Sequence, residues 1–93
     1  MHAVVISATF NDLSTARNDL PALVSMVSGL PGFVAGYWTE MSGDQGTAFV
    51  VFESEDDARS VAAGVQNGPS PPGVTPDAVT VGNVDVGEVW GHA

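Results

Sequence analysis

Cysteine and lysine are both absent from this chain of 93 residues. Without cysteine, the protein can form no disulfide, no thiolate metal site and no cysteine nucleophile. Without lysine, only Arg17 and Arg59 oppose eleven acidic side chains, which gives a formal net charge of −9. Nucleic acids and anionic lipids bind surfaces where lysine and arginine cluster. The composition therefore argues against nucleic-acid and membrane partners and favours a neutral or weakly polar ligand.

Long hydrophobic runs are missing as well. Residues 1–6 carry no basic region, and their apolar stretch is too short for a signal peptide or a membrane span, so we expect a cytoplasmic protein. The length allows one domain, residues 1–93. A chain of this size buries only about 60–65% of the surface that it exposes when unfolded, so it gains from covering a further face with a partner.

The first third of the chain predicts a strand followed by a helix. Residues 2–10 alternate, so that one face of a strand carries the side chains of His2, Val4, Ile6, Ala8 and Phe10. Residues 13–27 then place their apolar side chains on one helical face, after a cap at Asn11-Asp12. Pro21 should kink or divide this helix, and Gly29 with Pro31-Gly32 should end it.

The remaining residues predict two strands, a helix and a last strand. The strands run from Phe33 to about Met41 and from Thr47 to Glu53, and Ser54 caps a helix that Asn67-Gly68 closes. Pro69 to Asp77 is an extended, proline-stiffened connection, which serves either as a lid or as a passive connector. The last strand, from about Ala78 to Ala93, is unusually long, so we expect that part of it extends past its own sheet or that it carries a bulge near Gly82 or Gly87.

The order of these elements is βαββαβ. Standard connection rules fold that order into a ferredoxin-like α+β domain, with a four-stranded antiparallel sheet and both helices on one face. The other face of the sheet also carries apolar side chains. A second copy of the chain is the natural cover for it, so we expect a symmetric homodimer.

Three segments resemble a known family: "LPGFVAGYW" at residues 30–38, "GTAFVVFESEDDARSVA" at 46–62 and "VGEVWGHA" at 86–93. They look like the antibiotic-biosynthesis-monooxygenase-type members of the dimeric α+β barrel superfamily. That superfamily includes cofactor-free quinol-forming oxygenases, haem-degrading enzymes and isomerases. Fold-level resemblance does not choose among these activities.

The resemblance implies two kinds of site. In the cofactor-free oxygenases, Asn, Trp and Tyr line a pocket between sheet and helices. The resemblance makes Tyr37, Trp38, Asn83 and Trp90 candidates for such a site. In the haem-degrading members, a histidine on the second helix ligates the haem. This chain has no histidine between Ser54 and Gly68, so we expect no haem and no other cofactor.

Each aromatic and polar candidate also has a structural interpretation. Tyr37 and Trp38 are adjacent on a strand and must face opposite ways, so one serves the core or a cavity and the other the dimer face. Trp90 suits anchoring of the last strand. Asn83 and Asp85 are polar residues in an otherwise apolar strand. If their strand face lines the pocket, Asn83 orients a substrate oxygen and Asp85 acts as a base. If it is the outer face of an edge strand, both are ordinary solvated residues.

The charged residues and histidines complete the candidates. In this topology the start of the first strand meets the end of the last, so His2 and His92 are a weak candidate pair for a metal ion. Frayed termini are the alternative for both. Four acids surround the start of the second helix and are interpreted as capping charge: Glu53, Glu55, Asp56 and Asp57. Arg17 and Arg59 are interpreted as solvent-facing partners of these acids.

Two function classes stay open at this point. One is a cofactor-independent monooxygenase that acts on a phenolic or quinol-type compound. The other is a noncatalytic dimeric module that binds a small apolar or aromatic ligand or regulates a partner. The enzyme needs a pocket of more than about 300 Å³ between the helices and the sheet. A core packed without such a space would exclude the enzyme.

Overall fold

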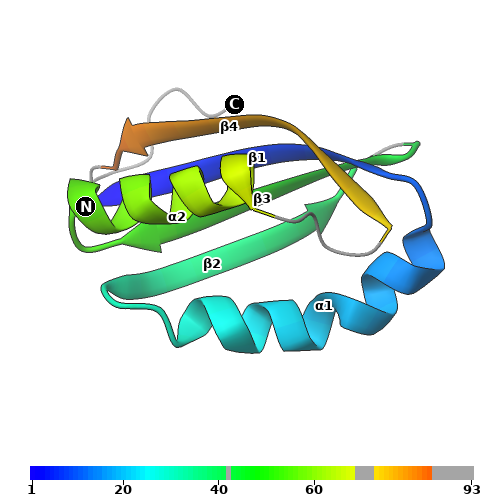
Figure 1. Ribbon diagram of the computed structural model, residues 1–93, viewed down its shortest axis with the longest axis horizontal. Helices are drawn as coiled ribbons and strands as arrows, with labels where there is room; N and C mark the ends of the chain where they lie inside the picture. Colours follow the sequence, from blue (N-terminus) through cyan, green and yellow to red (C-terminus); the bar gives the residue numbers. More distant parts are fainter. Residues whose placement is uncertain (42, 69–72, 85–93) are drawn as a thin grey trace, which may run out of the picture.

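A computed structural model describes residues 1–41, 43–68 and 73–84 (Figure 1). The elements follow the order predicted from the sequence: β1 (His2–Phe10), α1 (Leu13–Ser28), β2 (Phe33–Glu40), β3 (Gln45–Phe52), α2 (Glu55–Asn67) and β4 (Val74–Asn83). The strands form one antiparallel sheet in the order β2-β3-β1-β4. The ferredoxin-like prediction is therefore confirmed.

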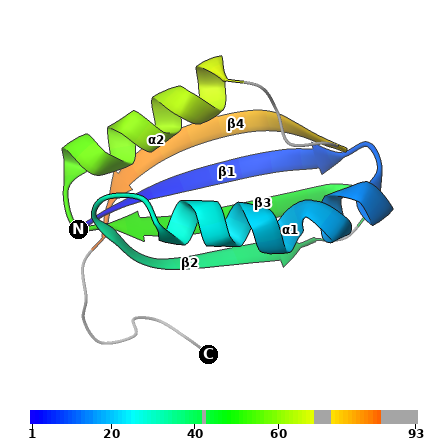
Figure 2. The same cartoon turned by 60° about the horizontal axis from the view of Figure 1, so that its bottom comes forward.

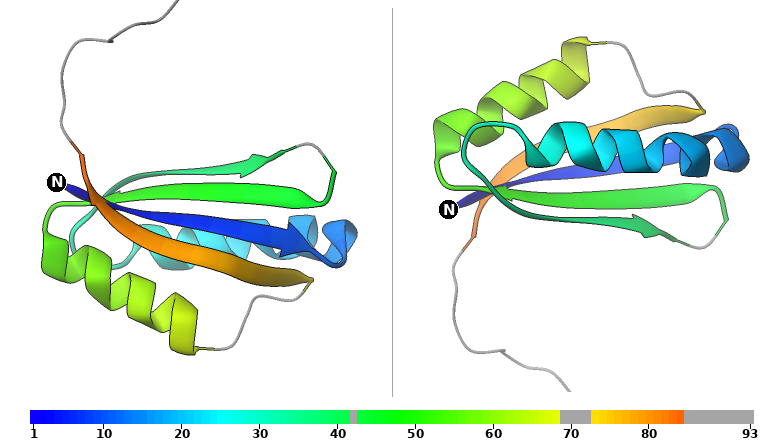
Figure 3. Two further views of the ribbon diagram at one scale, coloured as in Figure 1. Left: turned by 90° about the horizontal axis from the view of Figure 1, so that it is seen from above. Right: turned by 90° about the horizontal axis from the view of Figure 1, so that it is seen from below.

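Both helices lie on the same side of the sheet (Figures 2 and 3). Helix α1 packs mainly against β2, whereas α2 packs against β4, β1 and β3. The two helices thus cover opposite halves of one sheet face. We call this the helix face; the other side, the open face, carries no helix in the described part of the chain.

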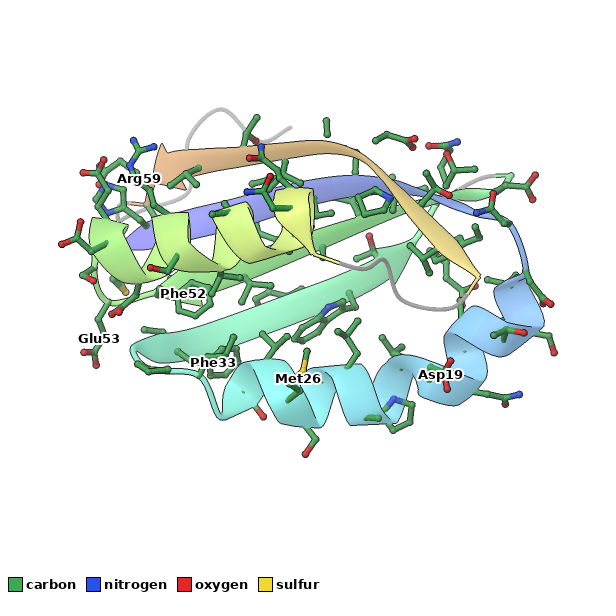
Figure 4. The ribbon with its side chains drawn as sticks, in the orientation of Figure 1. Asp19, Met26, Phe33, Phe52, Glu53 and Arg59 are labelled. Atoms are coloured by element: carbon green, nitrogen blue, oxygen red, sulfur yellow. The ribbon has the colours of Figure 1, made fainter. Side chains whose placement is uncertain are left out.

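The hydrophobic core is concentrated at one end of the helix face. Phe52, at the end of β3, is completely buried, and its ring meets that of Phe33 edge to face at a centroid distance of 6.2 Å. Phe52 lies beneath α2, and Phe33 lies at the start of β2 beside the end of α1 (Figure 4). The other buried members of this core cluster are Val4, Val27, Val50, Ala58 and Ala62.

Each helix begins at a side-chain cap. Asp12 accepts a hydrogen bond from the backbone N of Thr15, and Ser54 accepts one from the backbone N of Asp57. Pro21 does not divide α1: the helix is continuous from residue 13 to 28, and its axis bends along its length (Figure 1). The bend fits the loss of one backbone hydrogen bond at proline.

Strand β4 corrects two predictions. It begins at Val74, so residues 74–77 are part of the sheet and not of a loop. The register with β1 shifts between Ser7 and Ala8, which pair with Ala78 and Pro76 and leave Asp77 as the extra residue of a bulge. Pairing near Gly82 is regular. Because β4 is an edge strand, it tolerates a proline that cannot donate to the ladder.

Other boundaries move by one or two residues. Strand β2 ends at Glu40, before Met41, and β3 spans residues 45–52 where 47–53 were predicted. Several candidates named above lie outside the described residues: Asp85, Gly87, Trp90 and His92.

Candidate ligand-binding cleft

A cleft of about 1020 Å³ lies between the two helices and the helix face of the sheet. Its lining includes Leu13, Leu20 and Leu23 from α1, and Val61 and Val65 from α2. Apolar side chains of α1 and of all four strands make up most of the remaining lining. The space exists because α1 and α2 pack over different strands and diverge above the middle of the sheet (Figure 3). The solid core that would exclude a pocket is therefore absent from the described structure.

Small residues form the floor at the end of the cleft away from Phe52. Ala8 of β1 pairs with Gly46 of β3, and Ala48 pairs with Ile6. All four line the cleft. Side chains here are short, and the Phe10 ring covers Gly46, whereas Val50 and Phe52 fill the space at the other end.

Trp38 projects from β2 into the cleft, and its ring position depends on a glycine. A Cβ atom added to Gly36 would lie 2.6 Å from the indole ring, so the ring lies across the Gly36 backbone. The same atom would approach the Phe33 ring at 3.4 Å. The indole therefore extends along β2 toward the core end. It leaves the strand beyond Trp38 free of its ring.

Tyr37 lies on the open face, as its position next to Trp38 predicts. It pairs with Phe49 across the sheet, and the two side chains are 63% and 38% exposed. Of the two aromatic candidates, Trp38 alone lines the cleft.

An ion pair spans the cleft from helix to strand. Arg17 of α1 donates from Nε to Oε1 of Glu40 and from Nη2 to Oε2, both at 2.8 Å. Glu40 is the last residue of β2. Hydrogen bonding from Arg17 lowers the pKa of Glu40 below its ordinary value of 4.5, and the positive charge of Arg17 adds to this effect while desolvation opposes it. Glu40 is therefore ionised at neutral pH.

The prediction for Arg17 was wrong in its partner. Arg17 pairs with Glu40 and not with the acids of α2, whereas Arg59 does pair with Glu55 through Nε at 2.7 Å. The sequence carries a signal for this contact. Arg17 stands four residues after Leu13 and three before Leu20, and thus on the apolar side of the helix, while Glu40 shares the strand face of Trp38.

The remaining charges of the cleft are acidic. Asp19 of α1 (Figure 4) and Asp57 of α2 both line it. The Asp57 carboxylate lies against Gly32, whose φ of +77° and missing Cβ permit the contact. Arg17 is the only lysine or arginine among the cleft residues that the structure describes.

The polar candidates at the chain ends do not reach the cleft. His2 pairs with Asn83 across β1 and β4, and neither residue is part of the lining. His2 Nε2 lies 3.7 Å from Oε2 of Glu55, and Nδ1 is buried with no hydrogen-bond partner in residues 1–41, 43–68 and 73–84. Over the same ranges, no three metal-binding side chains cluster. Asp85 and His92 lie outside the described residues, so both stay untested.

Comparison with known proteins identifies the fold. No protein-family model and no curated protein matches the sequence. Among solved structures, the chain is similar to the haem degrader MhuD from Mycobacterium tuberculosis, which was solved with two haems bound in its active site. The likeness covers 91% of this chain and 99% of that one, with a TM-score of 0.55 and 18% identity. The expected resemblance is thereby confirmed at the level of the fold.

Within the described ranges, no helix is long and apolar enough to cross a bilayer.

The Arg17–Glu40 pair predicts a pH-dependent contribution to stability. Because the pKa of Glu40 is lowered on folding, the ionised carboxylate stabilises the native state above about pH 4.5, and this contribution is lost as the pH falls through the lowered pKa. We expect Glu40→Gln to lower the melting temperature at neutral pH, and to lower it progressively less as the pH falls below about 4.5. Thermal unfolding followed by circular dichroism at neutral pH and across this lower range measures the difference.

The exposed Asp44, in the turn between β2 and β3, provides the control, since Asp44→Asn removes the same charge outside the pair and away from the start of α2. An equal change in melting temperature in the two variants at neutral pH would contradict a specific contribution of the pair.

Proposed function

We propose that the protein binds a small, mostly apolar aromatic compound in the cleft between its helices and sheet. The observation that carries the proposal is the cleft itself. Its volume of about 1020 Å³ is at the upper end of the usual range for small-molecule sites, and apolar side chains make up most of its lining. Trp38 offers a ring for stacking against an aromatic ligand.

Within this class, we propose a cofactor-independent monooxygenase that acts on a phenolic or quinol-type compound. Such a substrate supplies the electrons itself, and dioxygen is the oxidant. Two features support the proposal: the resemblance to the cofactor-free oxygenases, and a cleft in which Trp38 lies on the same strand face as the Arg17–Glu40 pair. The noncatalytic alternative uses the same cleft for binding alone.

Haem fits this cleft poorly. Histidine, cysteine, methionine and tyrosine are the side chains that ligate haem iron in proteins. Among the cleft residues that the structure describes, Met26 is the only one of these types. Haem propionates also need cationic partners, but Arg17 is already paired with Glu40, and Asp19 and Asp57 add negative charge. We therefore propose no haem chemistry for this chain.

Oxygen uptake tests the enzymatic proposal. A panel of hydroquinones and polyphenols is offered to the protein in an oxygen-electrode assay, and calorimetry with the same compounds measures binding. We expect binding and oxygen consumption, both greatly reduced by Ala48→Leu, because a leucine there fills the floor beside Trp38. Ala63→Leu makes the same change on the exposed side of α2 and should leave both unchanged.

These measurements distinguish the monooxygenase from the noncatalytic binding module. Binding without oxygen consumption contradicts the monooxygenase and leaves the binding module. An absence of binding in a folded wild-type protein contradicts the cleft as a ligand site.

We also propose a homodimer formed through the open face. Val5, Tyr37 and Phe49 lie next to one another there across three strands, and exposed aromatic side chains of this kind are enriched at interfaces. A second copy would cover them at the same time on both chains.

Size-exclusion chromatography with light scattering tests the dimer. We expect wild-type protein at twice the mass of one chain, and Phe49→Lys at the mass of one chain with an unchanged far-ultraviolet spectrum, because the lysine introduces an unpaired charge into the interface. Ala63→Lys places the same charge on α2 and should stay dimeric. A wild-type monomer at micromolar concentration would refute the interface.

A further inference from the structure

The Arg17–Glu40 pair has unused hydrogen-bonding capacity. Each Glu40 oxygen accepts one hydrogen bond from Arg17, although a carboxylate has about four lone-pair sites in all. Arg17 uses two of its five N–H groups in the pair. The side chains of Arg17 and Glu40 are 60% and 45% exposed, so solvent or a ligand can reach both. A ligand hydroxyl can therefore donate to Glu40 and accept from Arg17 without breaking the pair.

The pair stands beside the part of the cleft that small residues leave open. Glu40 follows Trp38 by two residues on the same strand face, at about 7 Å along the strand. The residues of β3 that pair with them are Ala48 and Gly46. The Phe10 ring lies over Gly46, where a Cβ atom would come within 2.4–2.7 Å of it, so an aromatic ring limits this end of the cleft. Trp38 and the ion pair thus flank a floor of short side chains.

Charge makes this site selective. Glu40 neutralises Arg17, and Asp19 and Asp57 leave the cleft with an excess of negative charge, as the whole chain has. An anionic ligand that accepts a hydrogen bond from the remaining N–H groups of Arg17 lies beside the ionised carboxylate of Glu40. Like charges that face each other in a binding site oppose binding strongly. An uncharged hydroxyl meets no such penalty.

We infer that the Arg17–Glu40 pair determines ligand specificity, by selecting aromatic compounds with an uncharged hydroxyl group and excluding their carboxylate analogues. The inference rests on the proposed function of the cleft. It assigns the hydroxyl-recognising role to Glu40, with Arg17 as its neutralising partner.

Calorimetry with 2-naphthol and 2-naphthoate tests this, because the two compounds share one ring system and differ in the polar group. At neutral pH we expect wild-type protein to bind 2-naphthol at least about tenfold more tightly, a ratio typical of one unfavourable charge contact. Glu40→Gln frees Arg17 and should strengthen 2-naphthoate binding about tenfold, while 2-naphthol binding falls only a few-fold. Arg17→Gln should weaken 2-naphthoate further and largely retain 2-naphthol.

The second ion pair of the chain supplies matched controls. Arg59 and Glu55 form an exposed pair on α2, and neither residue lines the cleft. Glu55→Gln and Arg59→Gln change the net charge equally and should leave the ligand ratio unchanged. All four substitutions remove exposed charges that contribute little to stability, so the variants should fold.

The outcomes distinguish this inference from the proposed function. Opposite responses of 2-naphthoate binding in Glu40→Gln and Arg17→Gln, absent from the α2 controls, support it. Equal binding of both compounds by wild-type protein, or equal effects of Glu40→Gln and Glu55→Gln, overturns it while the cleft remains a binding site. Binding of neither compound contradicts the proposed function as well.

Discussion

Burial of Phe52 is the interaction on which the rest of the structure depends. Its side chain is fully covered where the end of β3, the start of β2 and the first turns of α2 meet, and the edge-to-face contact with Phe33 ties β2 to this point. A chain of 93 residues has few large side chains to spend on a core. The buried core cluster lies at this end, and beyond Val50 strand β3 carries Ala48 and Gly46 on the helix face. The core thus fills one end of the helix face, and the cleft occupies the rest of it.

The same arrangement explains how the cleft acquires a chemical character. Gly36 lets the indole of Trp38 lie along β2 toward the core, so that one wall is aromatic and the short side chain of Ala48 lies beside it. At the far end of β2, Glu40 meets Arg17 from the helix above. The cleft therefore combines an aromatic wall at Trp38 with a polar group at the ion pair, which suits an aromatic compound with one hydroxylated edge.

Much of the fold could be predicted from local patterns, because strand alternation, the Ser54 cap and the helical apolar stripe are properties of neighbouring residues. Alternation also separates Tyr37 from Trp38. The position of Pro76 inside β4 could not be predicted this way, since it depends on β4 being an edge strand. The contact between Arg17 and Glu40 joins residues 23 apart in the sequence, and only the packing of α1 over β2 brings them together.

The likeness to a solved structure concerns the fold, whereas the proposed function rests on the side chains of the cleft. The fold is shared with a haem degrader, yet the cleft has no histidine in its described lining and holds its arginine in an ion pair. A shared fold does not by itself carry an activity from one protein to another.

The central claim is that a hydroxylated aromatic ligand occupies the helix-face cleft. Chemical-shift mapping by NMR during titration with 2-naphthol tests it most directly. The account predicts shifts of the Trp38 indole and of the Ala8 and Ala48 methyl groups. Shifts confined to Tyr37 and Phe49 on the open face, or none at all, would contradict it.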